Sequence, residues 1–178
     1  VCSHQAEELF TAGTLETRLR KLSICHSVLS SVSPGLLAGA ASCLVELSLP
    51  STQLTSQQAA AVLGAIGPQT RLKKLDLSDN NMLFWDMDPS LLAGAVQLEE
   101  LRIRGTNSGS QVMSNLLAAI GPDTKLRKLD LDGNGSLVLV EPSLLARAAR
   151  WLEELSIEHT MITQPQIRAL FTTIAGPT

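Results

Sequence analysis

The sequence predicts an α/β solenoid, in which parallel strands line the concave face of a curved arc and helices cover its convex face. Two observations support this fold class. Leu supplies 32 and Ala 18 of the 178 residues, whereas the chain has two Trp, three Phe and no Tyr. A core so rich in aliphatic side chains and so poor in rings is typical of a repeat array. The second observation is a leucine motif that recurs along the whole chain.

The motif L-x-x-L-x-[LI] occurs six times, with steps of 25, 28, 26, 28 and 26 residues between the middle leucines. Every second unit matches better than its neighbour, so the repeating element is a pair of units of about 54 residues. We name the units after the residue before the middle leucine, which is Lys in one kind and Glu in the other. The Lys units begin at Leu19, Leu72 and Leu126, and the Glu units begin at Leu44, Leu98 and Leu152.

The repeats predict one domain over residues 1–178, with units starting near 19, 44, 72, 98, 126 and 152. Residues 1–18 match the helical half of a Glu unit, because VCSHQAEELFTAGTLETR aligns with LTSQQAAAVLGAIGPQTR. Solenoids need polar capping units, and neither end carries an atypical unit. We therefore expect a segment of a longer array, flanked by neighbouring repeats of the same longer chain.

Each unit is expected to contain one strand and one helix. The alternation L-x-L predicts a short strand with one buried face. In the first Glu unit Ala59, Val62, Leu63 and Ile66 have helical spacing. One strand and one helix per unit require parallel strands, giving six strands inside and seven helical segments outside.

Helix boundaries are marked differently in the two kinds of unit. In the Glu units, candidate capping boxes pair a Thr with a Gln three residues later, and Gly-Pro pairs are expected to stop the helices. In the Lys units a Pro is expected at the first helical position. The boxes are Thr55 with Gln58 and Thr163 with Gln166, and the prolines are Pro34, Pro89 and Pro142.

These motifs resemble the ribonuclease-inhibitor type of leucine-rich repeat, a class that includes the repeat regions of NOD-like receptors and the cytosolic ribonuclease inhibitor. The resemblance covers essentially the whole chain. The family pattern places Asn or Cys three residues beyond the last strand leucine, where the side chain satisfies turn backbone groups. Asn80 and Asn134 keep this residue, Ser27 weakens it, and Thr replaces it in the Glu units, where its hydroxyl can still join the ladder.

The exposed strand face is predicted to carry a ladder of alternating charge. Its first position over six strands reads Lys21, Glu46, Lys74, Glu100, Lys128 and Glu154. Parallel neighbours lie about 4.8 Å apart, so each residue can pair across strands. We interpret the ladder as cross-strand pairing that fixes the stacking order of the units. A ligand-binding role is the less favoured interpretation, because alternating charges neutralise one another.

The positions after the ladder are less regular and give the candidate partner-binding patch. Arg102 and Arg104 lie on the strand of the fourth unit, between acidic strands with which they could simply pair. If the concave face contacts a partner, we expect the contact at these central residues. The candidates are Asp76, Arg102, Asp130, Arg104 and Asp132.

Phe84 and Trp85 form the other candidate site. They belong to the irregular segment 82–87, and we favour packing at the strand-to-helix turn over an exposed aromatic anchor for a partner. Phe10 and Phe171 align with Leu63 and Leu117 of other units, so we expect both in the core.

Composition and motifs exclude several function classes. The net charge of −3 argues against a nucleic-acid surface, and no apolar run approaches the roughly 20 residues of a membrane span. The three Cys form no metal motif, and their odd number favours the reducing cytoplasm. Because no nucleophile triad, paired carboxylates or phosphate loop is present, we expect neither enzyme activity nor a cofactor.

The resemblance implies a protein-recognition or ligand-sensing module, as in the repeat part of an intracellular NOD-like-receptor-type innate immune protein or scaffold. Its partner is expected to be a protein of unknown identity. The alternative is a regulatory protein of the same repeat type, either a GTPase-activating protein for Ran or an enzyme inhibitor. An inhibitor of a basic enzyme should have an acidic, ring-rich concave face, whereas this face is mixed in charge and carries no rings.

Overall fold

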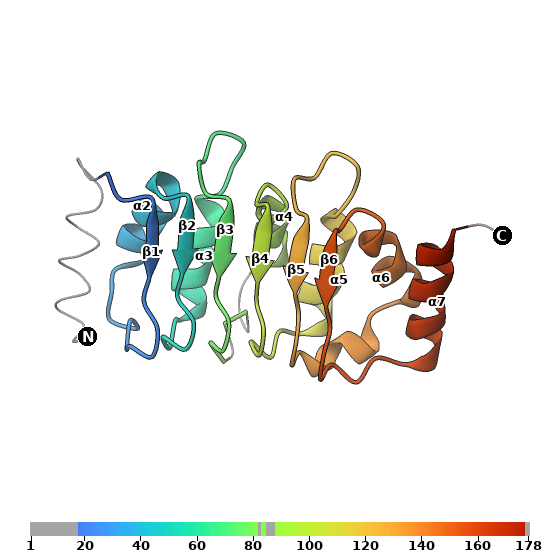
Figure 1. The fold of residues 1–178 in the computed structure, drawn as a ribbon. Coiled ribbons are helices and arrows are strands. Elements are labelled where there is room, and N and C mark those ends of the chain that lie inside the picture. Colours follow the sequence, from blue (N-terminus) through green and yellow to red (C-terminus); the bar gives the residue numbers. More distant parts are fainter. Residues whose placement is uncertain (1–17, 82, 85–87, 177–178) are drawn as a thin grey trace.

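The computed structural model describes residues 18–81, 83–84 and 88–176, and it contains a six-stranded parallel sheet with strands in chain order (Figure 1). Each strand has three residues centred on the middle leucine of a unit. The register pairs these leucines directly, so Leu22 lies opposite Leu47 and Leu47 opposite Leu75. The strands are β1 (Lys21–Ser23), β2 (Glu46–Ser48), β3 (Lys74–Asp76), β4 (Glu100–Arg102), β5 (Lys128–Asp130) and β6 (Glu154–Ser156). The predicted parallel sheet is confirmed.

Helices cover one face of the sheet, and the first strand and the last helix of the described chain lie at opposite ends of the row (Figure 1). The helices are α2 (Pro34–Cys43), α3 (Ser56–Gly64), η1 (Pro89–Leu91), α4 (Leu92–Ala95), α5 (Ser110–Ala119), η2 (Gly135–Leu139), α6 (Pro142–Ala149) and α7 (Gln164–Ala175). This strand–helix alternation is consistent with a solenoid. The helical segment expected before residue 18 lies outside the described residues. Among the described residues, no helix is both long and apolar enough to cross a membrane.

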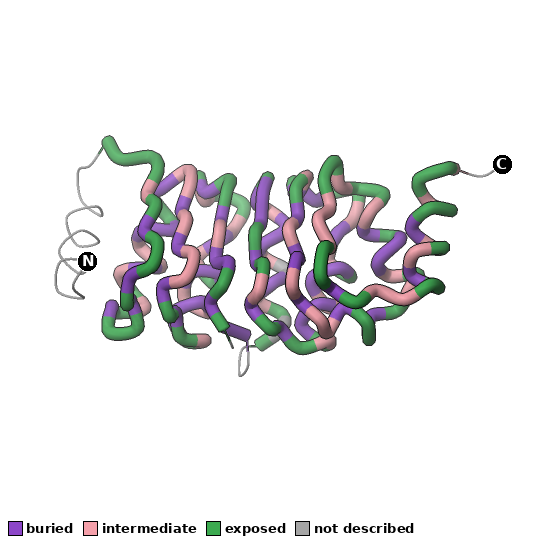
Figure 2. Tube along the Cα trace, turned by 60° about the horizontal axis from the view of Figure 1, so that its bottom comes forward, coloured by how far each residue is buried: buried purple, intermediate pink, exposed green. Residues whose placement is uncertain are grey.

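The hydrophobic core lies between the sheet and the helices, and it runs through the stack as a buried band (Figure 2). Most motif leucines form its sheet side, although Leu19 is 47% exposed. The predicted helical positions Ala59, Val62, Leu63 and Ile66 are buried and form part of its helix side. Removing this aliphatic surface from water is the main stabilising contribution to the fold.

Phe171 does not join the core, so the prediction for this residue is wrong. Its aligned counterparts Leu63 and Leu117 are 1% and 0% exposed, whereas Phe171 is 69% exposed. Those leucines lie between helices of neighbouring units, and Phe171 lies on α7, the last helix of the stack (Figure 1). The counterpart Phe10 lies outside the described residues.

Each strand ends in a turn that directs a polar residue into the core. The second residue after the last strand leucine has a left-handed backbone in all six units, with φ between 50° and 69°. The polar residue that follows is buried in every unit, at 7% exposure or less. These buried residues are Ser27, Thr52, Asn80, Thr106, Asn134 and Thr160.

Asn80 joins the second Lys unit to the Glu unit before it. Its Oδ1 accepts hydrogen bonds from the N–H groups of Thr52 and Leu54, both at 3.0 Å. Its Nδ2 donates to the carbonyl oxygens of Leu49 at 2.8 Å and Leu77 at 3.0 Å. The side chain is 1% exposed, so it replaces water for four backbone groups.

Asn134 repeats this arrangement one pair of units later. Its Nδ2 donates to Ile103 and Leu131 carbonyl oxygens at 2.8 and 3.0 Å, and its Oδ1 accepts from the hydroxyl of Thr106 at 3.1 Å. This hydrogen bond from the Thr106 hydroxyl confirms that Thr takes part in the row of buried polar side chains, as expected for the Glu units. We use the word module for a Lys unit and the Glu unit that follows it, so each Asn joins two modules.

Within a module, a buried glutamine fixes the turn of the Lys unit. The predicted capping box is present, because Thr55 Oγ1 accepts from the N–H of Gln58 and Gln58 Oε1 accepts from the N–H of Thr55. The Nε2 of Gln58 also donates to the carbonyl oxygens of Leu29 and Val32, at 2.7 and 2.6 Å. Gln166 makes the same bonds in the third module.

The second module lacks this glutamine, and its Lys-unit helix is shorter. Gly109 and Val112 occupy the positions of the capping Thr and Gln, so α5 begins without a side-chain cap. Pro89 begins a single 3₁₀ turn rather than the predicted α-helix, and α4 has 4 residues where α2 has 10. An apolar Val cannot donate the side-chain hydrogen bonds to turn carbonyls that Gln58 and Gln166 donate.

We predict that Asn80→Ala lowers the free energy of unfolding by about 3 kcal/mol, because several buried backbone groups lose their partner at once. Denaturant titration followed by circular dichroism measures this change. Asn115→Ala, on the surface of α5, is the control and should shift the stability by less than about 0.5 kcal/mol. Equal effects of the two substitutions would contradict the role of Asn80.

Candidate functional site

The strand face, which is the side of the sheet opposite the helices, carries the predicted ladder of alternating charge. The register aligns Lys21 with Glu46 and Lys74 with Glu100, as expected. Ion pairs join Lys21 Nζ to Glu46 at 2.8 Å, Lys74 Nζ to Glu100 at 3.2 Å, and Lys128 Nζ to Glu154 at 2.6 Å. The predicted cross-strand pairing is confirmed at these three places.

All cross-strand ion pairs among the described residues lie within a module and none lies between modules. Glu46 is also the direct register partner of Lys74, yet these two residues form no ion pair. A second row repeats the pattern, with Lys73 paired to Glu99 at 2.7 Å and Arg127 to Glu153 at 4.0 Å. Ionic contacts therefore hold the two units of a module together, whereas the buried Asn side chains join successive modules.

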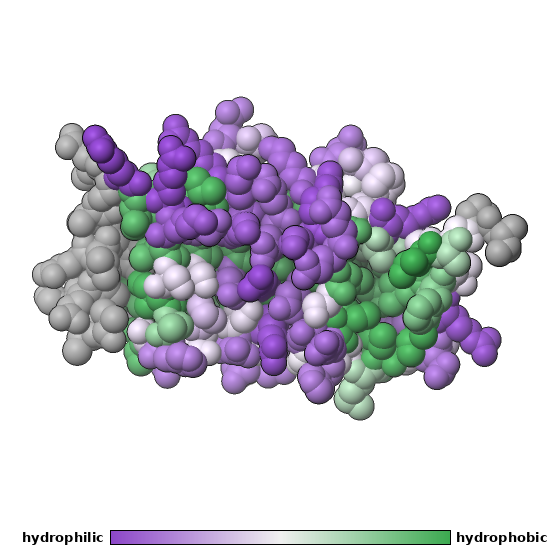
Figure 3. All heavy atoms as spheres, viewed as in Figure 1, coloured by the Kyte–Doolittle hydropathy of each residue, from purple (hydrophilic) through white to green (hydrophobic). Residues whose placement is uncertain are grey.

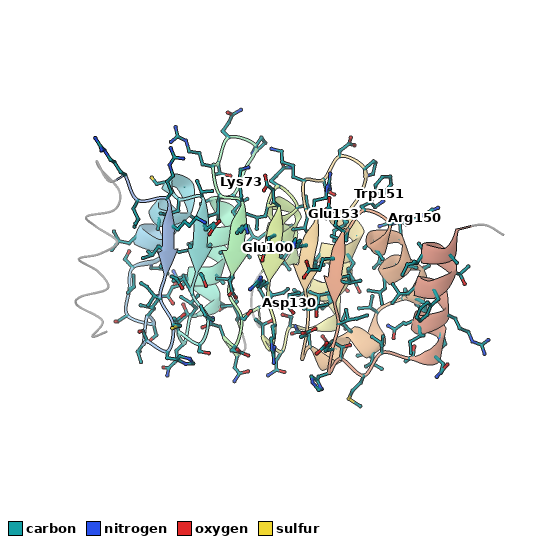
Figure 4. The ribbon with its side chains drawn as sticks, viewed as in Figure 1. Lys73, Glu100, Asp130, Arg150, Trp151 and Glu153 are labelled. Carbon is teal, nitrogen blue, oxygen red and sulfur yellow. The ribbon has the colours of Figure 1, made fainter. Side chains whose placement is uncertain are left out.

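Glu100 is the most strongly held charge of the strand face (Figure 4). Its side chain is 11% exposed and contacts Lys74 at 3.2 Å and Arg102 at 2.6 Å. Burial by itself raises the pKa of this carboxyl, but the hydrogen bonds and charges of Lys74 and Arg102 outweigh burial and lower the pKa below its ordinary value. Glu100 is consequently ionised at neutral pH and stabilises the fold there.

Arg102 pairs within its own strand rather than with the neighbouring acidic strands. The register places it beside Asp76 on β3 and Asp130 on β5, but its Nη2 lies 2.6 Å from Glu100 Oε1, two residues earlier in the chain. The expectation that Arg102 pairs with its neighbours is corrected in this respect. Glu100 is the better partner because its side chain is longer than that of Asp and follows the same face of the strand.

The three aspartates of the candidate patch are engaged in hydrogen bonds inside the chain. Asp76 Oδ1 and Asp130 Oδ1 each accept from the N–H group two residues later, at 3.0 Å. Asp132 is 7% exposed, and its Oδ1 accepts from the Ser156 hydroxyl and the Glu158 N–H, both at 2.7 Å. These carboxylates brace the strand ends, in the manner of Asx turns.

The pKa of the Asp130 carboxyl, labelled in Figure 4, is raised, so its charged form is disfavoured. Burial raises its pKa, and the nearby charge of Asp132 acts in the same direction. The hydrogen bond from the Asp132 N–H and the charges of Arg102 and Arg104 act in the opposite direction, but the net shift is upward. A positive charge brought close to Asp130 would therefore be favourable, as would loss of its own charge.

Arg104 differs from the other four candidates because, within the described chain, it forms neither an ion pair nor a side-chain hydrogen bond. It is exposed, and among the described residues no carboxylate oxygen lies within 4.0 Å of its guanidinium group. It follows β4 at the centre of the row, where the other units have Cys25, Pro50, Ser78, Asp132 and Glu158. The guanidinium group is available to a partner.

The strand face is shallow. One groove of about 210 Å³ lies over β2–β4, and another of about 100 Å³ lies over β4–β6. Cavities that enclose small molecules usually measure about 300–1,000 Å³. The face is better shaped for a protein surface than for a small ligand.

Phe84 is 2% exposed and belongs to the hydrophobic core, so it cannot act as an exposed anchor in this structure. Its position in the other modules is taken by Ser30 and Val138, which are both exposed. The structure thus favours packing for Phe84. Trp85 lies outside the described residues, and Leu139, at the equivalent position of the third module, is 72% exposed.

No group of three or more metal-ligating side chains gathers anywhere in the described part of the chain. The thiols of Cys25 and Cys43 are exposed and are not joined in a disulfide. No protein-family model matches the chain, and a search of curated proteins found no match. The functional assignment consequently rests on the residues themselves.

We predict that Glu100→Gln destabilises the protein by about 1–2 kcal/mol at pH 7, because two charge-assisted contacts are weakened. The pKa of Glu100 is lower in the folded state, so its stabilisation is present above the ordinary value of 4.5 and disappears as the pH falls through the folded value. Denaturant midpoints of both proteins across this pH range measure the difference. Glu153→Gln is the control, since its ion pair is long and exposed. A pH-independent difference, or a more stable variant at pH 7, contradicts this account.

Proposed function

We propose that the chain is the leucine-rich repeat region of an intracellular NOD-like-receptor-type protein and that it recognises a protein partner through its strand face. The recurring strand, left-handed turn, buried polar residue and helix support the repeat assignment, as do the Asn side chains that join the modules. Six motif copies in a continuous parallel sheet are what such a region needs to build an extended binding surface.

The observation that carries the recognition role is the difference between Arg104 and its neighbours. The ladder charges are neutralised by ion pairs, and the aspartates are held in turns. Arg104 projects from the centre of the face without a carboxylate partner among the described residues. An acidic side chain of the partner is its natural complement, and Arg is among the residues that contribute most to binding energy at interfaces.

Arg102 supports this contact from the adjacent position. Its guanidinium group is held at 2.6 Å by Glu100, which is itself held by Lys74. A side chain that is already ordered loses little conformational freedom when a partner binds. The two arginines thus offer one fixed and one free guanidinium group on a rigid surface.

The binding prediction requires a partner, which is obtained by using the chain as bait in a cytosolic extract, identifying the captured protein and purifying it. We predict that Arg104→Ala weakens the affinity of this purified partner about tenfold, and that adding Arg102→Ala weakens it further. Isothermal titration calorimetry measures both dissociation constants.

Two variants serve as controls for this measurement. Arg168→Ala removes an exposed charge on α7 and should leave the affinity unchanged. Asp130→Asn keeps the acceptor for the Asp132 N–H but removes a negative charge near Arg104, so it should leave the affinity equal or higher. Unchanged affinity in the Arg102→Ala, Arg104→Ala double variant would overturn the proposed site. An NTPase domain encoded upstream in the same gene would support the NOD-like assignment.

A further inference from the structure

The edge where the strands begin carries a second charged surface, separate from the centre of the strand face. Each Lys unit opens with the same pattern of a Thr, a basic residue, Leu and two further basic residues, as in TRLKK at 70–74 and TKLRK at 124–128. In the Glu units the basic residue before the first leucine is replaced by Cys43, Gln97 or Trp151. Lys73, Arg150, Trp151 and Glu153 mark this edge in Figure 4, and Figure 3 shows hydrophilic side chains gathered along it.

A groove of about 980 Å³ lies along this edge, across the starts of β1 to β5. One acidic residue, Glu99, is found among its lining residues, and it is bonded to Lys73 at 2.7 Å. The basic lining residues are Arg18, Arg20, Arg71, Lys73 and Lys125. The basic groove, as we name it, is thus strongly positive on a chain whose net charge is −3.

Folding does not account for these cations. Arg71 and Lys125 are exposed, and the leucines that follow them, Leu72 and Leu126, are 3% and 0% exposed. These leucines therefore fix the edge to the core. The Glu units have a leucine at the same position without a basic residue before it, so the basic residue is not needed for this packing. Within the described part of the chain, Arg18, Arg20, Arg71 and Lys125 have no carboxylate oxygen within 4.0 Å. Four cations of the groove are thus available to an anionic ligand.

The lining also contains apolar side chains, which distinguishes a peptide from a nucleic acid as the ligand. Leu19, which is 47% exposed, and Val45 contribute apolar surface beside the cations. No aromatic side chain is found among the groove's lining residues, whereas sites for single-stranded nucleic acid usually stack bases on aromatic rings. A chain with alternating acidic and apolar side chains matches both properties of the groove.

The spacing of the cations in the groove indicates that a bound peptide would be extended. Basic residues occur on every second strand, and strands are about 4.8 Å apart, so successive cations along the groove are about 9.6 Å apart. A polyproline II helix has three residues per turn and rises about 3.1 Å per residue, which places residues i and i+3 on one face about 9.3 Å apart. An acidic residue at every third position would therefore meet a cation at each step.

We propose that the basic groove binds an extended acidic segment of a partner protein, with an acidic side chain at every third residue and apolar side chains between them. The acidic groups contact Arg71, Lys125 and the arginines near β1, while the apolar side chains contact Leu19 and Val45. This surface is distinct from the Arg104 patch, and the proposal does not depend on the strand-face function.

Fluorescence anisotropy of a labelled peptide of repeated Glu-Pro-Leu triplets tests the proposal on the full chain. The double variant Arg71→Gln, Lys125→Gln should bind it at least tenfold more weakly, and binding to the unaltered chain should weaken as salt is added. The double variant Arg147→Gln, Arg168→Gln removes the same number of charges on α6 and α7 and should bind as the unaltered chain does. Circular dichroism confirms that each variant is folded.

Three comparison ligands make the outcome decisive. A Gln-Pro-Leu peptide tests the need for charge, and a peptide of the same composition with its Glu residues in one block tests the spacing. Oligothymidylate and inorganic polyphosphate represent other polyanions. Weaker binding of all of these supports the proposal. Equal binding of the Gln or block peptide, tighter binding of either polyanion, or no effect of Arg71→Gln, Lys125→Gln overturns it.

Discussion

The rest of the structure depends on a buried amide that satisfies backbone groups of two successive modules. A parallel stack of three-residue strands leaves some backbone groups of the turns after the strands without backbone partners, and buried backbone groups without partners are costly. Asn80 supplies two acceptor contacts and two donor contacts at one such turn, and Asn134 repeats the two donor contacts at the next junction between modules. The left-handed residue before each Asn directs the side chain inward, so backbone geometry and amide chemistry act together.

The Asn side chains act between modules, whereas the cross-strand ion pairs of the described residues act within them. Lys74 faces Glu46 on one side and Glu100 on the other, yet it pairs with Glu100. The stack therefore alternates two kinds of interface. An Asn amide lies at the turns between modules, whereas ion pairs lie on the strand face within modules, and a buried Gln adds hydrogen bonds within the first and third modules. This alternation explains why the sequence repeats every second unit rather than every unit.

Leucine spacing predicted the strands, their parallel order and the charge ladder, because burial of one strand face leaves a direct trace in the sequence. It could not predict contacts that depend on side-chain reach, and Arg102 pairs along its strand instead of across it. Alignment with Leu63 also placed Phe171 in the core, although α7 has a neighbouring helix on one side of the stack. The basic groove was missed because its signal is a difference between Lys and Glu units at one position, as at Arg71 and Gln97.

The central claim, that ion pairs act within modules and the Asn amides act between them, is tested most directly by two double-mutant cycles that share Lys74. One cycle combines Lys74→Ala with Glu100→Ala, the other combines it with Glu46→Ala, and the free energy of unfolding is measured for every variant. A coupling energy of about 0.5–1 kcal/mol is predicted for Lys74 with Glu100, and a value near zero for Lys74 with Glu46. Equal coupling in the two cycles would contradict the claim, since both glutamates lie on strands adjacent to Lys74.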